Sequence, residues 1–331
     1  MTQKIRIEEV AREAKVSITT VSRVINKVPT VSRDNRERVE EAIKKLKFRP
    51  NVSAQRLARG FSNSVGLVIP RYEGIFQSFY AMELIRGVGG ACESLQLDLL
   101  LHISNGDTAL NTSNMGGVIF ADIIDNRKQL ALAVEEKVPC MVMNYIVEDG
   151  SASYIAIDNK KGAQVAVEYL ISLGHRTIAT ITGGLITQAA QHRLEGYQQA
   201  LKQKGIALRE DYILKGDYSR RSARVAMEKL LKLEEPPAAV FVASDDMALE
   251  AIEVIIEKGL KVPEDISVIG FDDNPASIYG PIALTTVRQP LFHMAQLATK
   301  ELNAIISGKK KLPIKTILPT ELVIRESCTH Q

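Results

Sequence analysis

"VSITTVSRVIN", residues 16–26, combines a few apolar side chains with hydroxyl groups, an arginine and an asparagine. Val21, Val24 and Ile25 fall on one helical face, and Ser17 can cap this helix by accepting a hydrogen bond from a backbone amide. The residues predicted to point outward are Ile18, Thr19, Ser22, Arg23 and Asn26. A helix that buries so little is predicted to use its polar surface for something other than packing.

Short helices are predicted on both sides of this segment. Apolar residues recur at helical spacing over residues 7–14, and after the turn "KVPT" a helix capped by Ser32 would bury Val39, Ile43 and Leu46. Three small amphipathic helices, the second short and outwardly polar, describe a helix-turn-helix whose second helix enters a DNA major groove. The spacing alone also fits a small helical bundle with a solvated polar face. The distribution of charge along the chain distinguishes the two interpretations.

Charge is distributed unevenly along the chain. Residues 1–60 contain 15 Lys or Arg and 7 Asp or Glu, a net charge of +8, whereas the remaining residues contain 27 and 32, a net charge of −5. Because neutralisation of phosphates supplies most of the non-specific affinity for DNA, a basic head on a mildly acidic body favours the DNA-binding interpretation.

"RPNVSAQRLARG", residues 49–60, predicts a further helix that is marginal by itself. Pro50 ends the preceding helix, Asn51 can cap the next, and Gly60 follows about two turns later. Helices shorter than about 12 residues rarely form alone in water, so this one needs support. Leu57 lies between two arginines, which suggests an apolar wedge for a DNA minor groove with the arginines on phosphates.

From residue 64 onward, short apolar runs alternate with helical stretches. The runs are "SVGLVIP", "LDLLLHI", "GGVIFA", "CMVMN", "YIAID", "TIATIT", "AVFVAS" and "ISVIGFD". Continuous runs of this length predict buried parallel strands in βαβ units. There are more of them than one sheet usually holds, so we expect two doubly wound lobes.

Ligands of such sheets bind outside the carboxyl ends of the strands. Polar residues that follow the predicted strands are Asn144, Asp158, Ser244, Asp245, Asp246, Asp272 and Asp273. Arg193 begins a helix beyond "TIATIT", and Tyr218 lies in "KGDYS". Polar groups that converge on a cleft with one aromatic platform fit a small polyhydroxylated or heterocyclic ligand. For any single aspartate, a helix cap or a turn is an equally good interpretation.

The head resembles that of a known family. "IEEVAREAKVSITTVSRVINKVPTVSRDNRERVEEAIKKLKFRPNVSAQRLARG" resembles, without a gap, the head and hinge of the lactose/galactose repressor (LacI/GalR) family. The specific motif is V-S-x-x-T-V-S-R-V-[IV]-N followed by R-P-N-x-x-A-x-x-L. The resemblance implies a dimeric repressor that reads bases with Ile18, Thr19 and Arg23 and inserts Leu57, beside Ala54, into the minor groove. The other DNA-contacting residues are then Ser17, Thr20, Ser22, Asn26 and Asn51.

Later segments extend the resemblance over nearly the whole chain: "LGHRTIATITGG", "QHRLEGY", "VFVASDDMALEAI", "GLKVPEDISVIGFDD" and "LTTVRQP". They resemble the family's effector core, which is similar to periplasmic sugar-binding proteins. The positions that match effector-contacting residues are Asn144, Asp158, Arg193, Tyr218, Ser244 and Asp272. Arg193 with Asp272 could grip adjacent hydroxyls of a sugar or hydrogen-bond a base edge. We expect a sugar rather than a nucleobase, and we expect Asp245 and Asp246 to be helix caps.

We therefore expect an α/β protein with a helix-turn-helix head (1–49), a hinge helix and linker (50–61), and a two-lobed, doubly wound parallel-sheet core (62–331) like that of periplasmic binding proteins. The expected lobes comprise about residues 62–158 and 288–318, and about residues 159–287 and 319–331. Residues 105–115 are short for the crossover helix that the family usually has there. "ELVIRESCTHQ" lacks the heptad tail of tetrameric members, so a homodimer is expected.

Other classes of protein are disfavoured. No apolar run approaches the roughly 20 residues that span a bilayer, and "MTQKIRIEEV" has no signal-peptide core, so we expect a cytoplasmic, nucleoid-associated protein without a membrane partner. The three cysteines have no C-x-x-C spacing, so we expect no disulfide framework, metal or cofactor. A sugar-handling enzyme fused to a DNA-binding head is the alternative. No nucleophile-elbow, metal-spacing or phosphate-loop motif supports it.

Overall fold

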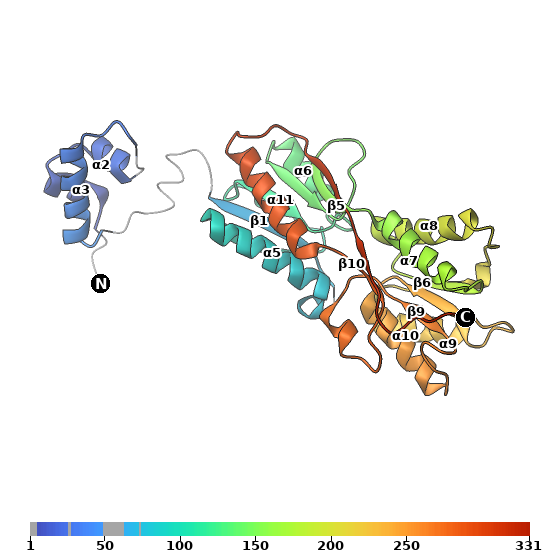
Figure 1. Ribbon diagram of the computed structural model, residues 1–331. Coiled ribbons are helices and arrows are strands. Elements are labelled where there is room, and N and C mark those ends of the chain that lie inside the picture. The colour runs from blue at the N-terminus through green and yellow to red at the C-terminus, as the bar shows by residue number, and fades with distance from the viewer. Residues whose placement is uncertain (1–4, 26–27, 49–62, 73) are drawn as a thin grey trace. The chain divides into compact units, whose positions relative to one another are not determined.

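The computed structural model describes residues 5–25, 28–48, 63–72 and 74–331 and contains two compact units, Met1–Asn63 and Ser64–Gln331 (Figure 1). Within the described residues, no helix is long and apolar enough to cross a membrane.

The described residues of the smaller unit form three helices, α1 (Ile7–Ala14), α2 (Ile18–Ile25) and α3 (Arg33–Lys45). Their apolar faces share one small core, formed by Val10, Ala11, Ala14, Val21, Val24, Val39 and Ala42. Three residues that we expected inside are only partly buried and pack against its margin: Ile25, Ile43 and Leu46. A core this small leaves the polar side of α2 outside.

The larger unit contains two parallel sheets, as the apolar runs predict. The first has the strand order β11-β5-β4-β3-β1-β2. Its strands are β1 (Ser64–Pro70), β2 (Asp98–Ser104), β3 (Gly117–Phe120), β4 (Cys140–Met143), β5 (Ser153–Ile157) and β11 (Lys315–Leu318). The second has the order β7-β6-β8-β9. Its strands are β6 (Ile178–Thr182), β7 (Ile213–Lys215), β8 (Ala239–Val242) and β9 (Ser267–Ile269).

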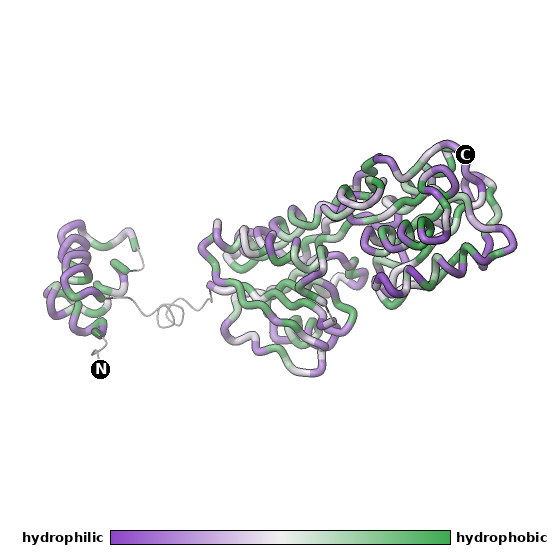
Figure 2. Tube along the Cα trace, turned by 90° about the horizontal axis from the view of Figure 1, so that it is seen from below, coloured by the Kyte–Doolittle hydropathy of each residue, from purple (hydrophilic) through white to green (hydrophobic). Residues whose placement is uncertain are grey.

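Helices cover both sheets. The first lobe contains η1 (Ile75–Gln77), α5 (Phe79–Leu95), α6 (Arg127–Glu135) and α11 (Leu291–Ile306). The second contains α7 (Asn159–Ser172), α8 (Gln188–Gln203), η2 (Glu210–Tyr212), α9 (Arg220–Leu230), α10 (Asp245–Glu257) and η3 (Pro275–Ile278). Helix α11 packs against α5, and α7 packs against α8 (Figure 1). Hydrophobic segments run through the interior of each lobe (Figure 2), and one buried apolar cluster includes residues of both sheets.

The chain crosses between the lobes three times. It passes from β5 to α7 at Asp158, from the second sheet through β10 (Thr286–Arg288) to α11, and from β11 to β12 (Glu321–Val323). Strands β10 and β12 pair antiparallel, with Arg288 opposite Glu321. A change in the angle between the lobes therefore has to be absorbed at these three crossings.

Residues 105–115 contain no helix and connect β2 to β3 as an irregular segment. The Gln129 amide of α6 holds this segment, because its Nε2 donates to the Thr108 carbonyl (2.6 Å) and to Ser104 Oγ (2.9 Å). Met115 is buried and fills the space over Gly66 of β1. This flank of the first sheet is thus covered by an irregular loop whose Leu110 and Met115 pack onto the core.

Two glycines of α5 allow a matched test of the packing between α5 and α11. A Cβ at Gly87 would lie 2.6 Å from the Phe292 carbonyl oxygen, whereas a Cβ at Gly90 would meet nothing within 4 Å. We expect Gly87→Ala to lower the unfolding free energy by about 1–3 kcal/mol through overpacking. Gly90→Ala should raise it by about 0.5–1 kcal/mol through helix propensity. Urea unfolding of the full chain checks both, and a Gly87→Ala variant as stable as Gly90→Ala would contradict the packing.

Candidate functional site

The outer face of α2 is the candidate DNA-contacting surface. Ile18 is 47% exposed, although an isoleucine is usually buried, and Thr19 and Arg23 are also exposed. Ser17 Oγ caps the helix by accepting a hydrogen bond from the Thr20 amide (3.1 Å), and it also lies 2.9 Å from Thr20 Oγ1. Ser22 is half-buried on the same helix. The surface thus presents one apolar side chain, one small hydroxyl and one guanidinium.

Four predicted DNA-contacting residues lie outside the residues that the structure describes: Asn26, Asn51, Ala54 and Leu57. The backbone just beyond α2 is held from α3. The Arg36 guanidinium donates to the Val28 carbonyl (3.2 Å), and the Val28 amide donates to the Arg23 carbonyl (2.9 Å). Helix α3 therefore fixes the end of α2.

A buried arginine lies at the centre of the candidate effector site. Arg193, in the second turn of α8, is only 4% exposed. Its Nε donates to Asn159 Oδ1 (2.9 Å), its Nη1 donates to the Ala243 carbonyl (2.5 Å), and its Cζ lies 3.7 Å from the centre of the Phe271 ring. These contacts fix the plane of the guanidinium, so it is preorganised to bind a polar ligand.

Asp272 provides the carboxylate beside this arginine, as the sequence predicts. Its Oδ1 lies 3.8 Å from Arg193 Nη1 and accepts a hydrogen bond from Gln289 Nε2. Burial raises the pKa of Asp272, and the Arg193 guanidinium opposes that rise. The Asp272 side chain keeps 19% of its surface exposed, so a ligand can reach it.

Asn144 and Asn159 link this group to the first lobe. Asn144 directly follows β4, has a left-handed φ of 57° and is 7% exposed. Asn159 Nδ2 lies 3.5 Å from Asn144 Oδ1, and Asn159 Oδ1 accepts the hydrogen bond from Arg193 Nε. Gln188, at the start of α8, also bonds both backbone groups of Ile146. The two lobes therefore touch through side-chain amides next to Arg193.

Tyr218, the aromatic residue predicted for this site, is half-buried in the second lobe. Its ring lies against Gly183, where a Cβ would come within 2.1 Å of Tyr218 Cζ. Burial raises the pKa of Tyr218, and the charges of Arg193, Asp272 and Asp122 also act on it. Charged groups of both lobes therefore act electrostatically on Tyr218.

Sequence analysis missed two first-lobe residues that are electrostatically linked to this site, Asp122 and Tyr80, and Tyr72, which is linked to both of them. Asp122 follows β3, and burial raises its pKa to about 7. Its carboxyl also raises the pKa of Tyr80, although burial is the larger cause, and acts in the same direction on Tyr72. The Tyr80 hydroxyl donates to the Ala121 carbonyl (2.6 Å). Asp122 follows the run "GGVIFA" as the other candidates follow theirs, so the rule that found them could have found it.

The other predicted residues are placed differently. Ser244 precedes α10, is 6% exposed, and its Oγ has no hydrogen-bond partner among the described residues. Asp158 caps α7 by accepting from the Lys161 amide (2.8 Å). It lines a separate cavity of about 120 Å³ with Lys161, Gly162, Val165, Val287, Pro319, Thr320 and Leu322. The Ser244 hydroxyl is thus available to a ligand near Arg193, because Arg193 Nη1 bonds the carbonyl of the preceding residue, Ala243. Asp158 instead lies at a cavity lined by residues of the crossings between the lobes.

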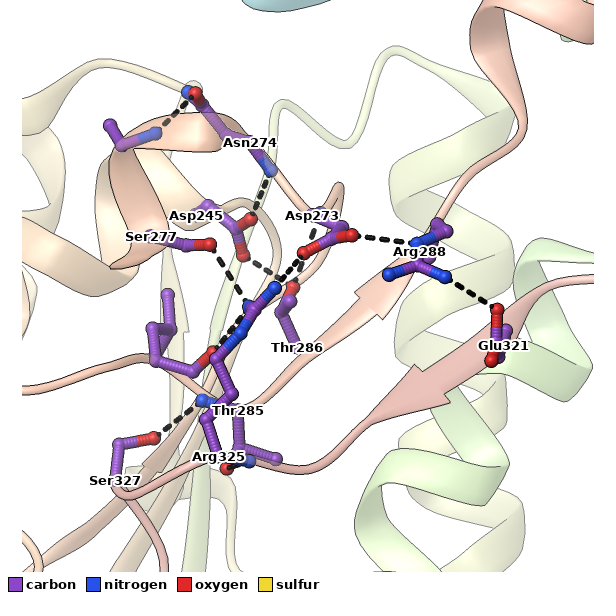
Figure 3. Close-up of polar contacts among 12 residues, drawn as sticks. Asp245, Asp273, Asn274, Ser277, Thr285, Thr286, Arg288, Glu321, Arg325 and Ser327 are labelled. Atoms are coloured by element: carbon purple, nitrogen blue, oxygen red, sulfur yellow. Dashed lines mark hydrogen bonds and ion pairs between the residues drawn. The ribbon is translucent and has the colours of Figure 1, made fainter. Parts of the chain in front are cut away.

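The prediction that Asp245 caps a helix is wrong. Asp245 is fully buried, and its carboxylate accepts from the Thr286 hydroxyl (2.5 Å) and the Asn274 amide (2.7 Å) instead of from amides of α10. Burial raises its pKa, and the neighbouring Asp272 adds to the rise. Asp246 accepts from Asn274 Nδ2 (3.0 Å). Both acids therefore hold the loop that carries Asp272 in place, as Figure 3 shows for Asp245.

In the described part of the chain, no group of three or more His, Cys, Asp or Glu could hold a metal ion.

Comparison with known proteins gives consistent matches. Residues 6–51 match the family described as bacterial regulatory proteins, lacI family, and residues 167–328 match a periplasmic binding protein-like domain. The chain is 36% identical to the probable HTH-type transcriptional repressor ExuR of Bacillus subtilis (strain 168), over 98% of each chain. Among solved structures, it is similar to the transcriptional regulator CelR–cellobiose complex, with 32% identity and a TM-score of 0.74 over 98% of this chain and 99% of that one. It is also similar to the lac repressor dimer bound to operator and the anti-inducer ONPF, with 28% identity and a TM-score of 0.82 over 99% and 100%.

Proposed function

Because the chain belongs to the lacI family of bacterial regulatory proteins and is a DNA-binding transcriptional regulator, we propose that it represses genes by binding a pseudo-palindromic operator as a homodimer. A small molecule held between the two lobes of its core controls this binding. The observation that carries the proposal is the preorganised Arg193, which lies beside the partly exposed Asp272 where both lobes meet. The head comprises residues 1–49, the hinge 50–61 and the core 62–331.

Each head places α2 in a major groove. Ile18, Thr19 and Arg23 read base edges, because they are the exposed side chains of α2 and differ in chemistry. Isoleucine suits a thymine methyl, and arginine suits a hydrogen-bond acceptor on a base. Ser17, Thr20 and Ser22 set the position of the helix on the DNA backbone. The parts played by Asn26, Asn51, Ala54 and Leu57 rest on the sequence resemblance.

The effector is a sugar or sugar derivative rather than a nucleobase. Arg193, Asp272, Ser244 and Asn144 offer donors and acceptors spread over both lobes, which suits several hydroxyls around one ring. Tyr218 supplies an aromatic platform. That Asp158 contacts the effector stays a prediction from the sequence, because in the structure its carboxylate caps α7.

An exposed apolar surface on the second lobe supports the homodimer. Tyr279 is 81% exposed, Ile278 48% and Ile256 46%. Ile278 and Tyr279 adjoin α10, because a Cβ placed at the next residue, Gly280, would lie 3.2 Å from the buried Leu249 of that helix. Exposed apolar side chains that cluster in this way mark protein interfaces. We expect Tyr279→Asp to turn a dimer into a monomer in sedimentation experiments, and a Tyr279→Asp variant that keeps the mass of a dimer would contradict this interface.

A two-step experiment tests the proposed function. A thermal-shift screen of cellobiose, glucose, galacturonate, glucosamine and hypoxanthine identifies which compounds bind. Gel shifts with an operator selected from a random duplex pool then measure whether each hit changes DNA affinity. A sugar that changes operator affinity without being consumed supports the proposal, whereas a response to hypoxanthine alone would contradict the assignment of a sugar effector. A hit that the protein converts chemically, or the failure to select any operator, would contradict it.

A further inference from the structure

Asp272 and Asp273 are neighbours whose side chains serve different parts of the molecule. Both have positive φ angles, 130° and 58°. The Asp272 carboxylate accepts from Gln289 and lies beside Arg193 in the effector site. The Asp273 carboxylate instead accepts from Arg325 Nη2 (2.5 Å) and Arg288 Nε (2.7 Å), as Figure 3 shows. A shift of this dipeptide would therefore move both the contacts of Asp272 in the effector site and the ion pairs of Asp273.

The contact with Arg288 connects Asp273 to the crossings between the lobes. Arg288 ends β10, and its Nη1 donates to Glu321 Oε2 (2.8 Å) at the start of β12. The chain leaves β10 for α11 of the first lobe, and β12 begins just after the chain has returned from that lobe. Asp273 thus ties the wall of the effector site to two of the three crossings.

The contact with Arg325 connects Asp273 to η3, next to the surface proposed for dimerisation. Arg325 Nη1 donates to Ser277 Oγ (3.0 Å) and to the Leu284 carbonyl (2.8 Å). Ser277 is fully buried in η3 and directly precedes the exposed Ile278 and Tyr279. The same carboxylate is therefore bonded to groups that hold η3 in place.

These ion pairs are partly shielded from water. The Asp273 side chain is 13% exposed and that of Arg325 is 18% exposed. Burial alone would raise the pKa of Asp273, but Arg325 and Arg288 outweigh it and lower the pKa, so the carboxylate is ionised at neutral pH. Exposed ion pairs contribute little to stability, whereas a partly buried carboxylate that accepts from two guanidinium groups, one on each oxygen, resists rearrangement more strongly.

We propose that Asp273 is the positioning residue that transmits occupancy of the effector site to the lobe crossings and to η3. This inference rests on the proposed function. An effector that bonds to Asp272 acts on the strained 272–273 backbone, and Asp273 passes the displacement to Arg288 and Arg325. An effector can shift the lobe arrangement only through its different affinity for the two arrangements, and this linkage provides that difference.

Asp273→Asn is the decisive variant. Asparagine has the same shape and tolerates a positive φ, but it carries no charge to hold two guanidinium groups. We expect the affinity for the effector alone and for the operator alone to stay within about threefold of wild type, because the substitution touches neither ligand. The factor by which the effector changes operator affinity, commonly about 5- to 150-fold in allosteric proteins, should fall at least about fivefold towards 1. A merely structural role would instead change the separate affinities.

The probe is whichever of cellobiose, glucose, galacturonate, glucosamine or hypoxanthine changes the operator affinity of the wild-type protein. Arg288→Gln removes the other half of one ion pair and should reproduce the loss of response. Asp211→Asn is the matched control, because it breaks an exposed Asp–Arg pair with Arg209 on the same lobe and should leave the response intact. An Asp273→Asn or Arg288→Gln protein with the full wild-type response would overturn this inference alone. A wild-type protein that responds to no probe would overturn the proposed function and, with it, this inference.

Discussion

Arg193→Ala is expected to abolish effector binding while leaving operator affinity close to that of the wild type. The buried guanidinium is held by Asn159 and the Ala243 carbonyl, so it is fixed before a ligand arrives. Truncating one partner of a buried, hydrogen-bonded charge pair typically costs about 2–5 kcal/mol, which corresponds to roughly 30- to several-thousand-fold in affinity. Isothermal titration calorimetry with the active probe measures the loss.

Two further variants make this result interpretable. Arg193→Lys keeps the charge but not the planar fork, so it should bind the effector more weakly than the wild type and remain folded. Arg176→Ala removes an exposed arginine of the same lobe and should bind the effector normally. Unchanged effector affinity in Arg193→Ala would remove this residue from the site.

Arg23→Ala is expected to have the second-largest effect, on DNA binding. Arg23 is exposed on α2, whose backbone is fixed by its cap at Ser17 and by the Arg36 contact beyond its end. Loss of one base-reading arginine should cost about 1–3 kcal/mol per head, or roughly 5- to 150-fold, and should relax sequence preference at one operator position. Fluorescence anisotropy with operator duplexes substituted one base pair at a time measures both effects.

The matched control lies in the same head. Arg12→Ala removes an exposed arginine of α1, which leaves the reading surface of α2 intact. It should lower operator affinity less and leave the order of preferred bases unchanged. If Arg23→Ala weakened operator and scrambled DNA equally, Arg23 would contact phosphates and not bases.

The head and the sheets were predictable from the sequence because their signals are local. The helical spacing of Val21 and Val24 predicts α2, and eight apolar runs correspond to parallel strands of the two sheets. The exposed residues of α2 follow from the same periodicity. The expected helix-turn-helix head and two-lobed, periplasmic-binding-protein-like core are confirmed by the family matches and by the similarity to the lac repressor.

The candidate site was only partly predictable, because its contacts join distant parts of the chain. Asn159 begins α7, 34 residues before Arg193, and nothing local distinguishes it from an ordinary helix start. Asp158, one residue earlier, has the same local signal but caps the helix. Asp245 resembles a cap in sequence, yet it bonds to Thr286 because β10 passes beside it. Strand-end residues can be found from sequence, but their partners depend on the packing of the lobes.

The response of operator binding to a cleft ligand tests the proposed mechanism most directly. Operator affinity should be measured by fluorescence anisotropy with and without the active probe, for the wild-type protein and for Arg193→Ala. The proposed mechanism predicts that the probe changes wild-type operator affinity at least about fivefold and leaves that of Arg193→Ala unchanged. Equal responses of the two proteins, or no response of the wild type to any probe, would contradict control of DNA binding from this site.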